Sequence, residues 1–494
     1  MLNWLLALLT AVLLILAFPG AHVAWLAAVA LAPLLVAVTR EPRPWRRFVM
    51  GWASGVIYWF GVCYWIQYVL AVHGGMSGAL AWALFTPFAV VKALHMGVFA
   101  LLAGILMRRW WAIPAVAALW VAIEVTHGPL GFAWLALGNA GIDMAVPMRL
   151  APFTGVYGLS FMFAMLSAAL ALAALKRPRT ELAWLAALVL VAFLPPLPGA
   201  RRGHDTALLA QPNVSETEEW TAQTMERTER EQAALTLRSL LAQTHNPPGI
   251  VVWPEVPATF YYDKDPDFRD YANGLARLSN AYLLIGVVAH TPEGAPLNSA
   301  ELISPEGAPV SRYDKVNLVP FGEFVPWPFG ALTEKISTEA GDFAAGRRVV
   351  VSPVGNNHKI GAFICYESVF PNFVRKFAAG GAEVLFNISN DGWFGKSAAR
   401  EQHLEIVRMR AAENRRWILR STNDGITATI DSAGRLRGTL PLYTEATSYT
   451  GFTYISERTL YTRYGNWFVL LCALLAVMGL VAEQARTMAT DEHG

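Results

Sequence analysis

Cysteine is scarce in this sequence of 494 residues, which contains only Cys63, Cys365 and Cys472. Three thiols this far apart form neither a disulfide framework nor the closely spaced pairs of a zinc site. Cys63 and Cys472 lie in long apolar runs, and we expect both to be small buried side chains. Cys365 stands alone in a polar part of the chain, where a reactive thiol is useful.

Charge is also scarce, and the shortage is local. Charged residues make up 15% of the chain, against roughly 25% in an ordinary globular protein. Residues 1–200 hold only 15 of the 76 Asp, Glu, Lys and Arg residues, so this part is typical of a membrane domain and the rest of a globular one. The net charge of +2 gives no reason to expect nucleic acid as a partner. No His, Cys and Asp residues cluster in the sequence, so we expect no metal and no cofactor.

Long apolar runs predict a polytopic helical membrane domain. The runs cover residues 3–18, 22–39, 49–72, 78–107, 111–127, 153–175, 181–198 and 464–482. A helix of about 20 apolar residues crosses a bilayer. We therefore expect about eight spans, seven within residues 1–200 and the last within residues 464–484.

The distribution of Arg and Lys predicts the orientation of these spans. Basic residues follow the second, fourth and sixth runs, whereas the turns at residues 19–21 and 73–77 have none. The basic residues are Arg40, Arg43, Arg46, Arg47, Arg108, Arg109, Lys176, Arg177 and Arg179. Because cytoplasmic loops are rich in Lys and Arg, we expect both termini in the cytoplasm and residues 205–455 on the opposite side.

The stretch between the last two runs alternates between two kinds of segment, which predicts a layered α/β domain over residues 205–455. Short apolar runs are typical of buried strands. They lie at residues 207–211, 249–253, 281–286, 360–364 and 383–387. Segments with a helical pattern lie at residues 217–243, 265–279, 371–379 and 400–415.

Three polar residues in this domain form a candidate catalytic set. Glu255, Lys315 and Cys365 are separated by 60 and 50 residues, and Glu255 and Cys365 each follow a predicted strand. A cysteine needs a base to become a nucleophilic thiolate, and a carboxylate in a dry pocket beside Trp253 and Pro254 suits that role. A lysine stabilises an oxyanion. Considered alone, each of the three residues has a simpler interpretation: Glu255 as a loop acid, Lys315 as a surface lysine and Cys365 as a core cysteine.

Other polar and aromatic residues leave two interpretations open. Ionisable groups in the apolar runs are either functional or hydrogen-bonded between packed helices; they are Lys92, His95, Glu124 and His127. His403 is interpreted as structural. The aromatic residues after Lys315 form either a local hydrophobic core or a mobile lid that meets lipid; they are Phe321, Phe324, Trp327 and Phe329.

Several longer motifs resemble those of the nitrilase superfamily, and within it the apolipoprotein N-acyltransferases, over nearly the whole chain. The segments are Trp253–Glu255, Lys315–Pro326, Cys365–Pro371, Asn387–Gly395, Gln402–His403, Arg410–Arg416, Gly155–Ser160 and Tyr461–Gly465. The resemblance implies an α-β-β-α sandwich for the polar domain. It also implies a bacterial inner membrane protein whose catalytic domain is periplasmic.

The resemblance implies a role for each matching residue. Glu255 matches the general base, Lys315 the catalytic lysine and Cys365 the nucleophile. The other matching positions are two supporting or oxyanion acids, Glu323 and Glu367, and a substrate-binding residue, Tyr366. Trp327 and Phe329 are further candidates for substrate binding. The chain departs from the usual motif at Asp314, where histidine is common, and in the segment Val-Pro-Ala-Thr after Glu255.

The implied activity is transfer of an acyl chain from a phospholipid, through a cysteine thioester, to the α-amino group of a diacylglyceryl-modified N-terminal cysteine. The implied partners are therefore a phospholipid, a diacylated apolipoprotein and the membrane, and we expect a monomer. Three alternatives remain: a membrane-tethered amidase of the nitrilase type, an acyltransferase with a different amine acceptor, and a lipid-binding scaffold without turnover. Reaction of Cys365 with a thiol probe would argue against the scaffold.

Overall fold

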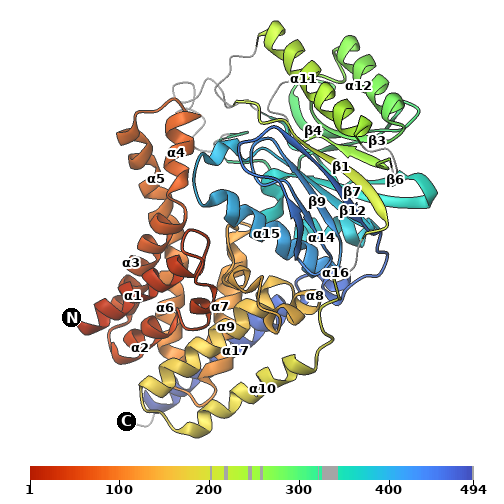
Figure 1. The fold of residues 1–494 in the computed structure, drawn as a ribbon. Helices are drawn as coiled ribbons and strands as arrows, with labels where there is room; N and C mark the ends of the chain where they lie inside the picture. Colours follow the sequence, from red (N-terminus) through yellow and green to blue (C-terminus); the bar gives the residue numbers. More distant parts are fainter. Residues whose placement is uncertain are drawn as a thin grey trace. The chain divides into compact units, whose positions relative to one another are not determined.

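The structure, a computed structural model, describes residues 1–200, 203–215, 221–242, 247–255, 260–320, 322–324 and 343–491. The chain divides into two compact units, both of which are drawn in Figure 1. The helical unit comprises Met1–Tyr68, Ser77–Leu197 and Tyr464–Gly494. The α/β unit comprises Val69–Met76 and Pro198–Arg463.

The apolar runs of the first unit form helices. They are α1 (Leu2–Ala17), α2 (Ala32–Arg40), α3 (Pro44–Val62), α4 (Trp65–Val72), α5 (Gly78–Lys92), α6 (Leu94–Leu106), α7 (Ala112–Glu124), α8 (Ala151–Thr154), α9 (Val156–Ala174), α10 (Ala186–Val189) and α17 (Trp467–Asp491). The second half of α4 and most of α16 (Leu460–Tyr464) belong to the α/β unit. The run predicted at residues 181–198 contains only the short α10 between two 3₁₀ segments, Arg179–Leu185 and Leu190–Phe193.

Three helical stretches in the described residues are long and apolar enough to cross a membrane. They are Gly78–Leu106, Val156–Ala174 and Trp467–Arg486. A fourth is added if α3 and α4, which meet at an angle of 57°, form one broken span. Shorter apolar helices cover Leu2–Ala17, Ala24–Arg40 and Ala112–His127. The predicted membrane-type helical region is present, whereas a count of eight spans stays a prediction.

The ionisable groups of the helical unit bond to neighbouring helices and loops. Lys92 Nζ lies 2.6 Å from His127 Nδ1 and donates to the carbonyl oxygen of Phe132 at 2.8 Å. Glu124 Oε1 accepts from Leu137 N at 2.7 Å and from Trp120 Nε1 at 3.1 Å. These contacts satisfy buried polar groups across the helix bundle, as packing hydrogen bonds do.

Two six-stranded sheets form the centre of the α/β unit. The first has the order β12-β1-β2-β3-β4-β5 and the second β11-β10-β9-β8-β7-β6. The strands are β1 (Asp205–Gln211), β2 (Ile250–Val252), β3 (Tyr282–His290), β4 (Pro296–Ile303), β5 (Pro309–Asp314), β6 (Val351–Val354), β7 (His358–Ile364), β8 (Val384–Ser389), β9 (Ile418–Thr422), β10 (Ala428–Ile430), β11 (Leu436–Thr439) and β12 (Ala446–Phe452). Strands β1–β3 and β7–β9 run parallel, and the outer strands pair antiparallel.

One pair of helices covers each sheet. Helices α11 (Ala222–Leu241) and α12 (Pro266–Ser279) pack on β1 and β3, while α14 (Pro371–Ala379) and α15 (Ala399–Asn414) pack on β7, β8 and β9. The inner faces of the two sheets meet through β1 and β9 and through β4 and β7. The predicted α-β-β-α sandwich is therefore confirmed, as are the five predicted strands and, within the described residues, the four predicted helices. Residues 217–220 and 243 of the first predicted helix lie outside the described residues.

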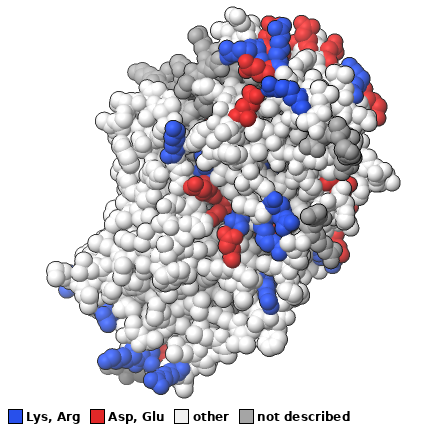
Figure 2. All heavy atoms as spheres, in the orientation of Figure 1, with Lys and Arg blue, Asp and Glu red and all other residues white. Residues whose placement is uncertain are grey.

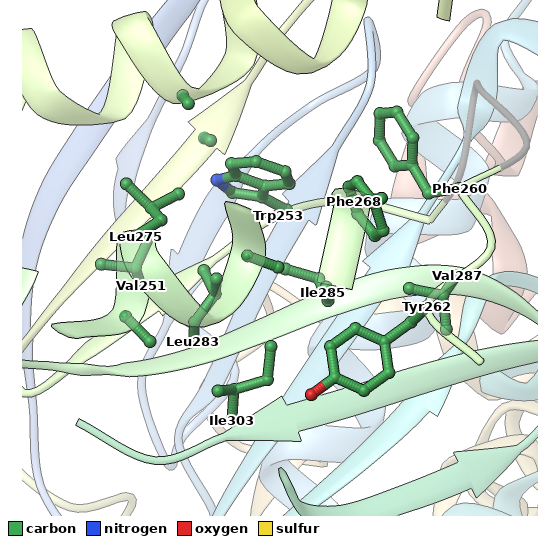
Figure 3. Close-up of a cluster of buried hydrophobic side chains, with 14 of the residues drawn as sticks. Val251, Trp253, Phe260, Tyr262, Phe268, Leu275, Leu283, Ile285, Val287 and Ile303 are labelled. Atoms are coloured by element: carbon green, nitrogen blue, oxygen red, sulfur yellow. The ribbon is translucent and has the colours of Figure 1, made fainter. Parts of the chain in front are cut away.

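The core beneath β2 explains the tryptophan that precedes Glu255. Trp253 is buried among Phe260, Phe268 and Ile285, between the first sheet and its helices (Figure 3). Its indole Nε1 donates to Thr236 Oγ1 of α11 at 3.0 Å. The chain leaves β2 after Val252, and Glu255 bonds to Asn298 of β4 and to the backbone N–H of Asn390 after β8. Trp253 thus anchors the segment in the core, and Glu255 two residues later is itself buried, with an exposure of 7%. That Trp253 helps to keep the base dry stays a prediction.

Charged side chains are spread unevenly over the visible surface. Figure 2 shows them gathered over the region of α11 and α12, in the α/β unit. On the face in view, the described part of the helical unit shows wide stretches of uncharged side chains. Helix α17, for example, exposes Leu470, Leu474, Val477 and Met478. An exposed apolar band of this kind suits a lipid environment.

Candidate active site

The three predicted catalytic residues follow the ends of three strands. Lys315 comes directly after β5, Cys365 directly after β7, and Glu255 three residues after β2. The structure brings them into one buried cluster in which exposure is 7% for Glu255, 1% for Lys315 and 7% for Cys365. Since β2 and β5 belong to one sheet and β7 to the other, the site is built where the two sheets face each other.

Glu255 is held by three N–H donors. Its Oε1 accepts from Lys315 Nζ at 3.1 Å and from Asn298 Nδ2 at 2.8 Å. Its Oε2 accepts from the backbone N–H of Asn390 at 2.8 Å. A carboxylate accepts such bonds with both oxygens, so the side chain is fixed on both sides.

Lys315 lies between two carboxylates. Its Nζ donates to Glu255 Oε1 at 3.1 Å and to Glu323 Oε1 at 2.8 Å. Burial alone would lower the pKa of Lys315, but Glu255 and Glu323 raise this pKa well above its ordinary value. The lysine is therefore a permanent cation, as an oxyanion stabiliser must be.

Glu323 completes this group and ties it to the loop after β5. Its Oε1 accepts from Asn298 Nδ2 at 2.6 Å as well as from Lys315, and its Oε2 accepts from Val319 N at 2.8 Å. Asn298 of β4 thus bridges both acids with one amide nitrogen. Sequence reasoning found Glu323 but missed Asn298, because a single asparagine inside a strand has no distinctive spacing.

Cys365 occupies a tight turn immediately after β7. Its φ angle is +48°, in the left-handed region that side chains rarely adopt. Burial raises the pKa of the Cys365 thiol, and the nearby Glu255 carboxylate raises it further, while Lys315 acts in the opposite direction. The resting sulfur is therefore a protonated thiol, which needs a base in contact with it to react.

Glu367 links the loops that carry Lys315 and Cys365. Its Oε1 accepts from Tyr313 Oη at 2.6 Å and from the backbone N–H groups of Val316 and Asn317 at 2.8 and 3.1 Å. Its Oε2 accepts from Ile364 N at 2.8 Å. Burial raises the pKa of Glu367 to about 7, although these donors hold the pKa down. Glu367 therefore acts as a clamp between the two loops.

The remaining predicted residues have different positions. Tyr366 is 4% exposed, and its ring stands edge-on to Phe370 at 5.4 Å between centroids. Trp327 and Phe329 lie outside the described residues. Asp314, at the position where histidine is common, accepts from Ser299 Oγ at 2.7 Å and pairs with Arg312 at 2.8 Å. This departure thus anchors β5 to β4 without touching Glu255 or Cys365.

Comparison with known proteins assigns the family. The sequence profile of the carbon-nitrogen hydrolase family matches residues 207–456, and that of the apolipoprotein N-acyltransferase N-terminal domain matches residues 10–169. An apolipoprotein N-acyltransferase of Geobacter metallireducens is 33% identical to this chain, over 98% of this chain and 96% of its own. The chain belongs to the apolipoprotein N-acyltransferase family.

A second relative agrees with this assignment. An apolipoprotein N-acyltransferase of Azotobacter vinelandii is 33% identical, over 94% of this chain and 92% of its own. Among solved structures, an amidase from Nesterenkonia sp. aligns with a TM-score of 0.39 and 19% identity, over 55% of this chain and 98% of the amidase. The two profiles fall on the two units of the fold, so family membership confirms the resemblance predicted from the motifs.

Proposed function

We propose that this chain is an N-acyltransferase of lipoprotein maturation. It moves an acyl chain from a phospholipid to the α-amino group of a diacylglyceryl-modified N-terminal cysteine, and Cys365 carries the acyl group as a thioester between the two steps. The observation that carries this proposal is the buried cluster of Glu255, Lys315 and Cys365 in a chain of this family. A cofactor is not part of the proposed reaction, and a monomer suffices for it.

The first half-reaction forms the thioester. Glu255 takes the thiol proton of Cys365 while the sulfur attacks the ester carbonyl carbon of the phospholipid. Two N–H groups of Lys315 donate to carboxylates, which leaves the third to stabilise the tetrahedral oxyanion. As this intermediate collapses, the carbon–oxygen bond breaks and Glu255 returns the proton to the departing lysophospholipid.

The second half-reaction forms the amide. The neutral α-amine of the acceptor attacks the thioester carbonyl carbon, and Glu255 takes a proton from the attacking nitrogen. The carbon–sulfur bond then breaks, and the Cys365 thiolate receives the proton back from Glu255. One base thus serves both halves of a ping-pong reaction.

A trapping experiment tests the proposal. Incubated with phospholipid vesicles alone, the purified full-length enzyme should gain one acyl group on Cys365, seen by mass spectrometry, and release about one lysophospholipid per active site. A peptide with an N-terminal diacylglyceryl cysteine should then remove the adduct and become N-acylated. Hydrolysis of small amides without any acyl adduct from common phospholipids would replace this proposal by an amidase function.

We also propose a membrane arrangement for the two units. Residues 1–200 and 464–484 form about eight spans in a bacterial inner membrane, and residues 205–455 form the periplasmic catalytic domain. Three or four helices of sufficient length and the basic residues after the second, fourth and sixth apolar runs support this arrangement.

A reporter experiment tests the orientation. Alkaline phosphatase, which is active only outside the cytoplasm, should be inactive when fused after Gly494 and active when it replaces the chain from Asn213 onward. A fluorescent protein that folds only in the cytoplasm should give the opposite pattern at the same two positions. Activity of phosphatase at Gly494 would overturn the proposed topology.

A further inference from the structure

A buried polar network lies behind the nucleophile, and the proposed reaction does not use it. It joins His403 of α15 to Asp391 after β8, Arg420 of β9 and Ser368 in the turn that Cys365 opens. All four side chains have an exposure of 0%. Complete burial of three ionisable groups lowers the stability of the fold unless the groups are paired and hydrogen-bonded to one another. A network of this kind therefore suggests a function.

His403 is the centre of this network. Its Nδ1 lies 3.0 Å from Asp391 Oδ1, and its Nε2 lies 2.8 Å from Ser368 Oγ and 3.1 Å from the carbonyl oxygen of Cys365. The ring therefore contacts both ends of the turn from Cys365 to Ser368. Helix α15 packs against this turn, and His403 supplies a polar part of that contact.

The charge state of Asp391 determines how the histidine is oriented. Burial alone would raise the pKa of Asp391, but Arg420 and His403 hold this pKa well below its ordinary range. An ionised carboxylate only accepts hydrogen bonds, so Nδ1 of His403 carries the proton and donates a hydrogen bond to Asp391. Burial and Arg420 lower the pKa of His403, so the ring is neutral. Its Nε2 therefore accepts from Ser368 Oγ, and this bond is the one that holds the turn. Arg420 Nη2 donates to Asp391 Oδ2 at 2.5 Å, which fixes the other oxygen of the carboxylate, and Arg420 Nη1 donates to the side chain of Asn387.

The order Asp391, His403, Ser368 has the connectivity of a hydrolytic triad. A second nucleophile is nevertheless ruled out by access, because Ser368 has no exposed surface. The geometry of the turn gives the network another use. Cys365 has a φ angle of +48°, and a residue with a side chain keeps this unfavourable conformation only when its surroundings hold it there.

We propose that His403 is a positioning residue for Cys365. It holds the turn from Cys365 to Ser368 in the left-handed conformation that presents the thiol to Glu255 and Lys315, and Asp391 fixes the orientation of its ring. Glu367 holds the other side of the same turn through Ile364 N at 2.8 Å. The inference rests on the proposed role of Cys365 as nucleophile.

A matched pair of variants tests this role. In His403→Gln the longer amide reaches the position of Nε2 and so keeps a polar contact with the turn. In His403→Asn the shorter amide keeps the contact of Nδ1 with Asp391 but does not reach the turn. We expect His403→Asn to form the thioester about 10- to 100-fold more slowly at saturating phospholipid, with KM for phospholipid changed less than about threefold. We expect His403→Gln to recover most of this rate.

The measurements use the full chain in the background Cys63→Ala and Cys472→Ala, so that Cys365 is the only thiol. Single-turnover thioester formation and alkylation of Cys365 by iodoacetamide are followed in parallel, and thermal unfolding reports the folded fraction. The inference would be overturned if His403→Asn and the parent formed the thioester at equal rates per folded enzyme. It would also be overturned if His403→Asn and His403→Gln lost the same fraction of this rate. If His403→Asn does not fold, Ser368→Ala replaces it, with the same slowing expected and an unchanged rate as the contrary result.

The two measurements also separate this inference from the proposed function. A parent enzyme that forms no thioester would contradict the proposed function. Alkylation needs no phospholipid, so it still shows whether His403 positions the thiol. A parent that forms the thioester together with an unslowed His403→Asn variant would contradict the positioning role alone.

Discussion

Replacing Cys365 by alanine should abolish N-acyl transfer. The substitution removes the sulfur that carries the acyl group, and the loss of a nucleophile reduces turnover by roughly 10⁴-fold or more. Only one buried atom is lost, since alanine keeps the backbone and the Cβ of the turn, so the folded protein should persist with a stability cost of about 1 kcal/mol. Transfer of labelled acyl chains to a diacylglyceryl cysteine peptide measures the effect.

The two other cysteines provide the control. Cys63 and Cys472 are also buried, with exposures of 0% and 1%, and both belong to the helical unit. Cys63→Ala and Cys472→Ala therefore carry the same chemical change at a similar burial. Each should keep transfer within about twofold of the wild type, with a stability cost of about 1 kcal/mol. Transfer by Cys365→Ala above about 1% of the wild-type rate would disprove the covalent mechanism.

Much of the α/β fold could be predicted from apolar runs. The parallel strands β1, β2, β3, β7 and β8 are buried on both faces, so their sequences read as continuous apolar segments. Strands at the sheet margins have no such run. All four residues of β11 are exposed, and β12 has mostly half-buried positions. β9 was not predicted although it is fully buried, because its sequence Ile-Leu-Arg-Ser-Thr is largely polar. It includes Arg420, which pairs with Asp391.

The catalytic residues could be predicted because each stands in a distinctive segment at the end of a strand. Their partners could not. Asn298 reaches Glu255 and Glu323 only because β4 lies beside β5 with Ser299 opposite Asp314. His403 reaches the turn of Cys365 only because α15 packs over it. Both contacts depend on pairing between distant segments, which no local spacing in the sequence reveals.

Replacing Lys315 by methionine should remove both activity and stability. The variant keeps the length of the side chain but leaves Glu255 and Glu323 buried around an uncharged group. Breaking a buried ion pair in this way costs about 3–5 kcal/mol. Loss of the oxyanion donor alone costs roughly 10²–10³ in turnover, and misplacement of Glu255 adds to that. Chemical unfolding and acyl transfer measure the two effects, and Lys264→Met, at an exposed lysine, is the matched control.

The pH dependence and a second substitution separate the charge effect from lost packing. In the wild type the raised pKa of Lys315 keeps its contribution to stability constant from pH 5 to 8, because the lysine is protonated in both the folded and the unfolded chain there. In Lys315→Met the two unpaired carboxylates favour protonation in the folded state, so the variant should regain stability as the pH falls from 8 to 5.

The double variant Lys315→Met with Glu323→Gln removes one of the two charges. It should recover part of the stability at pH 8 while remaining inactive, since the cation that faces the oxyanion is still missing. A stability loss that is equal at pH 5 and pH 8 and unaffected by Glu323→Gln would show that Lys315 contributes packing alone.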